Sequence, residues 1–533
     1  MLKYLERGGV NDGFSKHHCI PYSMIALQEA NFITQYPPIY WNTSVLLTES
    51  GATEKEQEDG ESKEGQKDNS AMGGAIATLQ KQGVDISLPD INKAIVGFKP
   101  DESTNSIIYG LKGISSINNK TAEIIMANRP YTSMKDFHDR LHLVKQEVKT
   151  KDGKVQKKAL ISKEQMINLI KGGAFDTVEP NKTRQEVLEE YLHMEYPDKK
   201  AITTTNLDQL INRGLIPSEY DDELMYYDFR EYLRQGKKVN DGDLPFHKEN
   251  GYKVTKSKKW YLLDGVDEVD TQEVVDAFFN MFPELQQGKH WEYVEDNGDY
   301  YPNAIWVESG ATSKDSFEGV YKRKIARLLD FMRSDDLLQA YNESLFTDVK
   351  NVHMQGSQAT WEFESLAMYH SDHELAHINK EYYNISNFHD LPTEPVVEDY
   401  WEKVDKETGE VIKIPKFKIE QICGVVLGKN KNKSILTLLT ESGVVNCKYQ
   451  SGQFAFYDRS ISIPDEETGK NKTVEKSFFQ RGTLLMVRGI RVGEVFRAKV
   501  YRNGLWSHST AKIEKLFDDG ICLLQEERYR IED

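Results

Sequence analysis

The stretch from residue 420 to residue 449 reads EQICGVVLGKNKNKSILTLLTESGVVNCKY. Its apolar runs are short, and apolar and polar residues tend to alternate along them with a period of two, which is typical of β-strands. Lys, Asn and Gly residues separate the runs, and such residues favour turns. The stretch therefore predicts three short strands joined by turns.

Two more strands are expected downstream, in RGTLLMVRGIRV (481–492) and EVFRAKVYRN (494–503). Five short strands within about 90 residues fit a small closed β-barrel of the OB type. The segment 411–515 contains 19 Lys and Arg against 9 Asp and Glu, a net charge of +10, so the rest of this chain of net charge −17 carries −27. A local basic surface can still bind phosphates, because salt screens more distant charges beyond about 8 Å.

Cations and aromatic residues of the barrel segment are candidates for binding single-stranded nucleic acid. Bases stack on aromatic rings, while Lys and Arg pair with phosphates. The alternative is that about half of these aromatic side chains belong to the barrel core. The candidate residues are Lys429, Lys431, Lys433, Tyr449, Phe454, Arg488, Arg491 and Arg497.

Residues 107–141 and the region near 159–194 each predict two helices joined by a tight turn. In a helix–hairpin–helix, backbone N–H groups of the turn and of the next helix bind one phosphate, whatever the base sequence. The turn needs a residue with positive φ; in the first turn Asn is better suited than Ser116, and the second has glycines. The alternative is two ordinary helical hairpins. The candidate DNA contacts are Lys112, Asn118, Asn119, Lys120, Lys171, Gly172 and Gly173.

The segment HSDHELAHI (370–378) contains an H-E-x-x-H match at 373–377. On a helix, His373 and His377 can hold one zinc ion while Glu374 acts as the base of a peptidase. A third ligand is required, and His370 would lie about 10.5 Å from His377 along the helix axis, too far to share one ion. The flanks are also polar. A zinc peptidase is therefore the less favoured interpretation, and we expect no metal on this chain.

Several motifs occur in the order found in the C-terminal half of the bacterial replicative DNA polymerase III alpha subunit, a C-family polymerase. Residues 14–47 resemble the fingers segment of that family, and VDISLPDIN (84–92) resembles its G-I-x-V-L-P-P-D-I-N motif. LIKGGAFD (169–176) is similar to its L-I-x-A-G-A-F-D motif. ESLAMYHSDHEL (364–375) resembles E-x-L-G-x-Y-L-S-x-H-P-L, which precedes the family's barrel. This resemblance gives His373 a structural role.

The resemblance implies an α+β multidomain chain, mostly helical in its fingers and tandem helix–hairpin–helix parts and all-β in its OB-fold barrel. The polar stretch 51–75 has almost nothing to bury and predicts a disordered loop. The expected domains are fingers (1–95), tandem helix–hairpin–helix (96–199), a divergent acidic α+β insertion (200–355), a helical connector (356–410), the OB barrel (411–515) and a tail (516–533).

In the family, the fingers contact the incoming dNTP, a role that the resemblance transfers to Lys16, His18 and Tyr22. The pentapeptide NESLF (342–346) is similar to the family's sliding-clamp motif, which implies clamp contacts at Leu345 and Phe346. The alternative for NESLF is an ordinary helix end.

The aspartates of the family's palm, P-D-x-D-x-D-F, are missing from the sequence. We therefore expect the C-terminal half of a split polymerase, which binds primer–template DNA, single-stranded template and dNTP. Its partner would be a separate chain that carries the palm and Mg²⁺, and this half would be inactive alone. The alternative function is a stand-alone accessory protein that binds single-stranded nucleic acid or the clamp.

The four cysteines, Cys19, Cys423, Cys447 and Cys522, lie far apart and form no C-x-x-C pair. This spacing suits neither a zinc knuckle nor a disulfide framework, and it favours a reducing compartment. No apolar run approaches the length of about 20 residues that a membrane helix needs. The expected location is the cytoplasm of a bacterial cell, with a host or a viral gene as the source.

Overall fold

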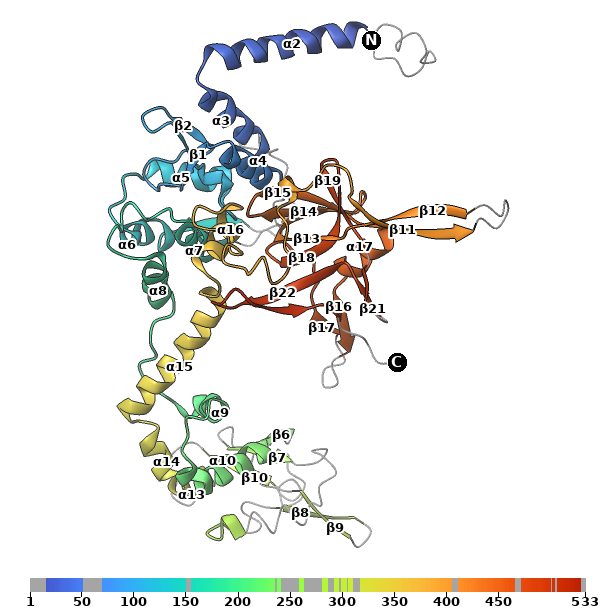
Figure 1. The fold of residues 1–533 in the computed structure, drawn as a ribbon. Coiled ribbons are helices and arrows are strands. Elements are labelled where there is room, and N and C mark those ends of the chain that lie inside the picture. Colours follow the sequence, from blue (N-terminus) through green and yellow to red (C-terminus); the bar gives the residue numbers. More distant parts are fainter. Residues whose placement is uncertain are drawn as a thin grey trace. The chain divides into compact units, whose positions relative to one another are not determined.

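The computed structural model describes residues 16–50, 70–149, 155–234, 237–240, 258–262, 280–285, 292–296, 299–303, 305–309, 317–404, 411–464, 471–499, 501–503 and 506–528. The chain forms two compact units. One unit combines Met1–Tyr191 with His353–Asp533, and the other comprises Leu192–Val352 (Figure 1). No described helix is both long enough and apolar enough to cross a membrane.

The first unit begins with helices and a small sheet. Its elements are α2 (Lys16–Gln35), α3 (Pro38–Glu49), α4 (Ser70–Lys81), and β1 (Asp85–Ser87), β2 (Lys99–Asp101) and β3 (Ser106–Ile108) in the order β1-β3-β2. Residues 70–75 of the predicted loop 51–75 belong to α4, and the rest of that prediction, residues 51–69, lies outside the described residues.

The helical hairpins follow this sheet. They contain α5 (Asn119–Ala127), α6 (Met134–Phe137), the ribbon β4 (Lys145–Lys149) and β5 (Val155–Ala159), α7 (Lys163–Lys171) and α8 (Arg184–Glu195). Polar caps define the helix starts: the side chain of Asn118 caps α5, and Ser162 with Gln165 forms a capping box at α7. Both signals are encoded locally, because they satisfy N–H groups of the first helical turn.

The connector between the hairpins and the barrel contains α16 (Gln358–Leu366) and the ribbon β11 (Val397–Val404) and β12 (Val411–Phe417). The barrel strands are β13 (Glu420–Asn430), β14 (Ile435–Thr440), β15 (Gly443–Lys448), β18 (Leu484–Val492) and β19 (Val495–Ala498). They follow the order β13-β14-β15-β19-β18, and pairing of β18 with β13 closes the barrel.

Only β15 and β19 pair in parallel among the described barrel strands, and α17 (Ser451–Asp458) lies between β15 and β18 in sequence. The expected α+β class, with a helical hairpin region before an OB-type barrel, is thus confirmed. Beyond the five strands, β22 (Thr510–Leu516) pairs with β18 and with β23 (Cys522–Gln525). The predicted tail from 516 therefore contributes a strand. Shorter ribbons are β16 (Ile461–Pro464) with β17 (Asn471–Glu475), and β20 (Tyr501–Asn503) with β21 (Trp506–His508).

The second unit has its own apolar core, formed by residues that include Leu207, Tyr227, Phe282, Leu328 and Tyr341. Its helices are α9 (Leu207–Asn212), α10 (Asp221–Arg234), α13 (Phe317–Lys324), α14 (Ala326–Phe331) and α15 (Asp335–His353). Its strands are β6 (Lys237–Asn240), β7 (Lys258–Leu262) and β10 (Ile305–Ser309) in one sheet, and β8 (Glu292–Asp296) with β9 (Asp299–Asn303) in another.

Candidate nucleic-acid interface

The turn of the first hairpin leads into helix α5. Ser116 has φ of 64°, a left-handed conformation that side chains other than Gly rarely adopt. The expectation that an asparagine would supply this conformation is wrong for Asn118, whose φ is −105° and whose side chain accepts the Thr121 amide at 2.8 Å. An N-cap needs a non-helical, extended backbone. The left-handed residue is therefore the serine two positions upstream.

Helix α7 holds this serine in place. The Nε2 of Gln165 donates to the carbonyl oxygen of Ser116 at 3.0 Å and to Oγ1 of Thr121 at 3.1 Å. The Nδ2 of Asn168 donates to Oγ of Ser116 at 2.9 Å. Two amide side chains of one helix thus order the turn, and Asn118 and Lys120 remain exposed at the start of α5, with Asn119 half-buried.

The predicted contacts at the second turn are corrected by the structure, because Lys171, Gly172 and Gly173 are buried. The ammonium of Lys171 lies 3.4 Å from Glu364 and over the ring of Trp361. Gly173 has φ of 77°, and a Cβ there would lie 2.7 Å from the Arg184 guanidinium. Helix α16 and Arg184 cover this turn, so its glycines serve packing. Lys112 is also buried and offers no exposed ammonium to DNA.

A buried ion pair lies behind the second turn. Nη1 of Arg184 contacts Oε1 of Glu362 at 2.8 Å, and Nη2 of Arg184 contacts Asp176 at 2.8 Å. Oε2 of Glu362 accepts the amides of His370 and Ser371, each at 2.8 Å. Burial alone would raise the pKa of Glu362, but these hydrogen bonds and Arg184 outweigh it and hold the pKa below its ordinary value. The network joins α8, α16 and the segment after α16.

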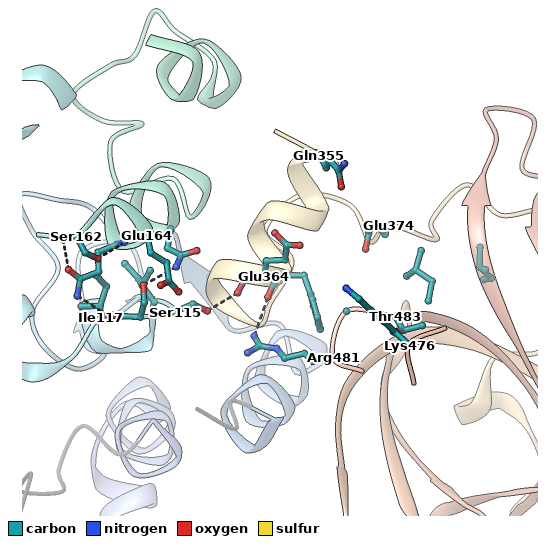
Figure 2. A pocket seen from close by; sticks show the side chains of 18 of the residues that line it. Ser115, Ile117, Ser162, Glu164, Gln355, Glu364, Glu374, Lys476, Arg481 and Thr483 are labelled. Atoms are coloured by element: carbon teal, nitrogen blue, oxygen red, sulfur yellow. Dashed lines mark hydrogen bonds between the residues drawn. The ribbon is translucent and has the colours of Figure 1, made fainter. Parts of the chain in front are cut away.

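A groove of about 1640 Å³ lies between the first hairpin and the barrel. Figure 2 shows Ser115, Ile117 and Ser162 on its hairpin side, Lys476 and Thr483 on its barrel side, and Glu364 between them. Its charges are mixed, since three cations face four carboxylates: Lys476, Arg481 and Lys512, and Glu164, Glu364, Glu374 and Glu514. A phosphate backbone gains little in such a groove. The groove as a whole is therefore a poor site for a phosphate backbone, although Ser116 and Asn118 of the first hairpin line its hairpin side.

The aromatic candidates of the barrel are mostly core residues. Tyr449 and Phe454 are both buried in one apolar cluster, where they pack against Phe479. The prediction that they stack on bases is therefore wrong, because their rings lie inside the barrel core. Arg491 is buried as well: its guanidinium donates to the carbonyls of Phe388, His389 and Leu391. Through these hydrogen bonds Arg491 links the connector to strand β18 of the barrel.

Three further cations are engaged within the protein. Lys429 and Lys431 both pair with Asp458, and the ammonium of Lys431 lies 3.3 Å from that carboxylate. Arg488 donates to Gln421 at 2.7 Å and lies 3.4 Å from Glu526. Lys431 is still largely exposed, whereas Lys429 and Arg488 are about a quarter to a third exposed. These pairs reduce the charge that the three cations can offer to a phosphate.

A basic surface remains on the outside of strands β15 and β19. Lys448 and Arg497 lie directly opposite each other in the parallel pair, and both are exposed. Lys448 also donates to the carbonyl of Lys433, whose exposed side chain belongs to the β13–β14 turn. Within the described parts of the chain, none of these three cations forms an ion pair. We call Lys433, Lys448 and Arg497 the barrel triad.

Sequence reasoning identified Lys433 and Arg497 but missed Lys448. The signal was present, because Asn446 and Lys448 occupy the outward positions of GVVNCK, where exposed and buried residues alternate. What the sequence did not reveal was the parallel pairing that places Lys448 beside Arg497.

The fingers candidates are only partly described. The side chains of Lys16 and His18 lie outside the described residues, while Tyr22 is 67% exposed on α2. A dNTP contact by these three residues therefore stays a prediction.

The clamp candidates lie within helix α15 of the second unit. Leu345 packs against the core of that unit, and the ring of Phe346 stacks on His193 with centroids 3.7 Å apart. Asn342, at the first position of the motif, accepts the Lys199 amide at 2.9 Å. All three side chains are already used for packing or hydrogen bonding within this unit.

The H-E-x-x-H segment is a turn, not the helix that its zinc interpretation requires. Nδ1 of His373 accepts the Leu375 amide at 3.0 Å, so Nε2 carries the proton and donates to the Leu439 carbonyl at 3.1 Å. Glu374 accepts from Tyr369 at 3.1 Å. Both nitrogens of His373 are therefore occupied, and the residue anchors this segment to strand β14, as its structural interpretation predicted.

Comparison with known proteins agrees with this architecture. The family model described as a helix-hairpin-helix motif matches residues 83–185. The chain is 33% identical over 520 residues to the probable DNA polymerase YorL of Bacillus subtilis and to a DNA-directed DNA polymerase of Bacillus phage SPbeta. The match covers 97% of this chain but 35% of each relative, so the chain spans about one third of their length.

Replicative polymerases match as well. The DNA polymerase III subunit alpha of Borreliella burgdorferi is 27% identical over 227 residues, which is 41% of this chain and 17% of that protein. The subunit of Campylobacter jejuni is 30% identical over 166 residues, 31% of this chain and 11% of that protein. The chain is therefore homologous to bacterial and phage DNA polymerases over almost its whole length and to DNA polymerase III alpha subunits over part of it.

Proposed function

We propose that this chain binds primer–template DNA as the C-terminal half of a polymerase III alpha-type enzyme whose palm lies on a separate polypeptide. The observation that carries the proposal is the ordered hairpin turn at Ser116, which occurs in one unit with a closed barrel that presents the exposed cations of the barrel triad. Amides at a helix N-terminus donate hydrogen bonds to a phosphate, and exposed cations neutralise its charge.

The first hairpin is proposed to hold duplex DNA. The N-terminus of α5 carries N–H groups that point out of the helix, and the helix dipole favours an anion there. The exposed side chains of Asn118 and Lys120 flank this end. A phosphate bound in this way is recognised without base contacts. With Lys171, Gly172 and Gly173 buried, the first hairpin alone supplies this contact in the proposal.

The barrel is proposed to bind single-stranded template through the barrel triad. Three cations on neighbouring strands and one turn can follow successive phosphates. Because Tyr449 and Phe454 belong to the core, we expect little contribution from base stacking. Binding should therefore be insensitive to sequence and strongly dependent on salt.

Nucleotide and metal contacts complete the proposal. Lys16, His18 and Tyr22 would contact the incoming dNTP, and the partner's palm would hold the Mg²⁺ ions that stabilise phosphoryl transfer. We do not extend the proposal to a sliding clamp at Leu345 and Phe346, because clamp binding there would require both side chains to leave their present contacts.

The test combines binding with synthesis. Purified chain should bind a fluorescent primer–template in an anisotropy titration, yet incorporate no nucleotide until the palm-bearing polypeptide is added. Incorporation by this chain alone would contradict the split arrangement. Binding of single strands without any gain of synthesis on adding that polypeptide would instead support a stand-alone accessory protein.

A further inference from the structure

The ribbon of β4 and β5 lies between the two helical hairpins in the sequence and is strongly basic. Its ten residues, 145–149 and 155–159, contain four lysines and one glutamate, which give a net charge of +3 in a chain of net charge −17. The side chains of Lys145, Lys157 and Lys158 are exposed. The ribbon therefore concentrates positive charge on an acidic chain, and such a surface attracts an anionic partner.

The exposed lysines lie on both faces of the ribbon, which is a sheet of two strands. Neighbouring residues of a strand point to opposite faces, so Lys157 and Lys158 lie on different faces. Glu147 is the pairing partner of Lys157, and Lys145, two residues before Glu147, therefore shares the face of Lys157. Of these three lysines, Lys157 alone lies opposite a carboxylate. Each face of the ribbon thus offers positive charge to a partner.

Hydrogen bonds fix the base of the ribbon next to helix α7. The Leu160 amide donates to the Val144 carbonyl at 3.1 Å. Nδ1 of His142 donates to the Ile161 carbonyl at 2.7 Å. The next residue, Ser162, is the N-cap of α7. The ribbon is therefore attached directly to the N-terminal end of α7.

The same end of α7 holds the turn of the first hairpin. Gln165, the third residue of α7, donates to the carbonyl oxygen of Ser116 at 3.0 Å. Ser116 and Ser162 line the same groove. Because a strand rises by about 3.4 Å per residue, the ribbon extends about 17 Å from its base. That base lies beside the turn that is proposed to hold DNA.

We infer that the β4–β5 ribbon binds the phosphate backbone of duplex DNA, next to the contact made by the first hairpin. This rests on the proposed function, in which that hairpin holds a duplex. Each DNA strand carries one phosphate per about 3.4 Å, so a ribbon of about 17 Å can follow about five phosphates. The buried turn of the second hairpin, at Gly172 and Gly173, offers no phosphate contact. The ribbon that precedes the first helix of that hairpin supplies a contact in its place.

The salt dependence of duplex binding by the full chain tests the inference. The ribbon variant carries Lys145→Gln, Lys157→Gln and Lys158→Gln, and it is titrated with fluorescent duplex DNA by anisotropy at several salt concentrations. Each lost phosphate contact lowers the magnitude of the slope of log affinity against log salt by about 0.9 on a duplex, so we expect a fall of about 2 to 3. Arginine at the same three positions should keep the slope of the parent.

A matched control removes the same charge elsewhere in this unit. It carries Lys413→Gln, Lys416→Gln and Lys472→Gln, at exposed lysines of other two-stranded ribbons. Its slope on duplex DNA should equal that of the parent. Both variants change exposed side chains, so their urea midpoints should equal that of the parent. An equal fall of the slope in the ribbon variant and the control would overturn the inference, because net charge alone would then explain it.

Single strands and lipid vesicles provide the other outcomes. The ribbon variant should keep the slope of the parent on single-stranded DNA, which the proposed function assigns to the barrel triad. A fall on single strands with an unchanged slope on duplex DNA would overturn the inference. Loss of binding to vesicles of phosphatidylglycerol and phosphatidylcholine, with an unchanged duplex slope, would overturn it as well and assign the ribbon to a lipid surface.

Failure of the inference can be told from failure of the proposed function. If Lys120→Gln weakens duplex binding while the ribbon variant binds as the parent does, the first hairpin keeps its proposed role and the inference on the ribbon fails. If the parent chain does not bind duplex DNA at all, the proposed function fails, and the inference fails with it.

Discussion

His373 illustrates how one side chain can be misread from its neighbours in sequence. Its ring is partly buried, and this burial lowers its pKa below the ordinary value of 6.5. The folded state thus favours the neutral imidazole, whose two nitrogens are matched by a donor and an acceptor. Protonation would place a second N–H against the Leu375 amide and remove this match.

The first prediction is a loss of stability on acidification that depends on His373. Below about pH 6.5 the unfolded chain binds a proton that the folded state excludes, so the free energy of unfolding falls as pH falls. His373→Gln, which keeps a donor for the Leu439 carbonyl, should show a smaller fall between pH 7.5 and pH 5.5 in urea titrations. Parallel curves for parent and variant would contradict this account.

Substitution of Glu362 is expected to lower the free energy of unfolding by a large amount. Its carboxylate is fully buried and is held by Arg184 and two backbone amides. Glu362→Ala leaves a buried guanidinium and those amides without this partner, so we expect a loss of about 3–5 kcal/mol in the free energy of unfolding. Glu364→Ala is the matched control, because the side chain of Glu364 is 53% exposed. Similar losses for both variants would refute the role of Glu362.

Among the elements, the first hairpin shows how a turn keeps its shape without its usual glycine. The conformation of Ser116 is imposed by α7, through Gln165 and Asn168. We predict that Ser116→Val lowers the free energy of unfolding by about 1–2 kcal/mol, because a β-branched residue resists the left-handed region. Ser116→Gly should be tolerated. Lys120→Val, in ordinary helical backbone, is the control, and urea titration is the measurement.

The barrel triad leads to a prediction of how the affinity for single-stranded DNA depends on salt concentration. Each phosphate contact adds about 0.7 to the magnitude of the slope of log affinity against log salt on single strands. Lys448→Gln and Arg497→Gln should each reduce that slope by this amount, whereas Lys472→Gln, an exposed lysine of β17, should not. Anisotropy titrations at several salt concentrations measure the slope. An unchanged slope in both triad variants would place the single strand elsewhere.

The whole molecule consists of two units with separate cores. Calorimetry should therefore resolve two unfolding transitions. Tyr341→Ala removes a buried ring from the core of Leu192–Val352. It should lower the midpoint temperature of one transition, because the free energy of unfolding of that unit falls by about 3–5 kcal/mol. Glu362→Ala should lower the midpoint temperature of the other transition. A common shift of both transitions by either variant would show that the units unfold together.

Much of the fold followed from local sequence. The five barrel strands and their turns were predicted because a period of two and turn-forming residues are local signals. The cap of α5 is likewise a local signal at Asn118. The motif order from the fingers to the barrel indicated a DNA polymerase, and related DNA polymerases match 97% of the chain.

Tertiary structure decided which candidate residues face solvent. Tyr449 and Phe454 are covered by the barrel interior, and the Lys171 turn is covered by α16, far away in sequence. Lys448 and Arg497 lie opposite each other because β15 pairs in parallel with β19, although β18 lies between these two strands in the sequence. The sequence by itself therefore determined the elements and the family. Exposure and proximity of side chains were decided by long-range packing, because they depend on which distant segments cover or adjoin each residue.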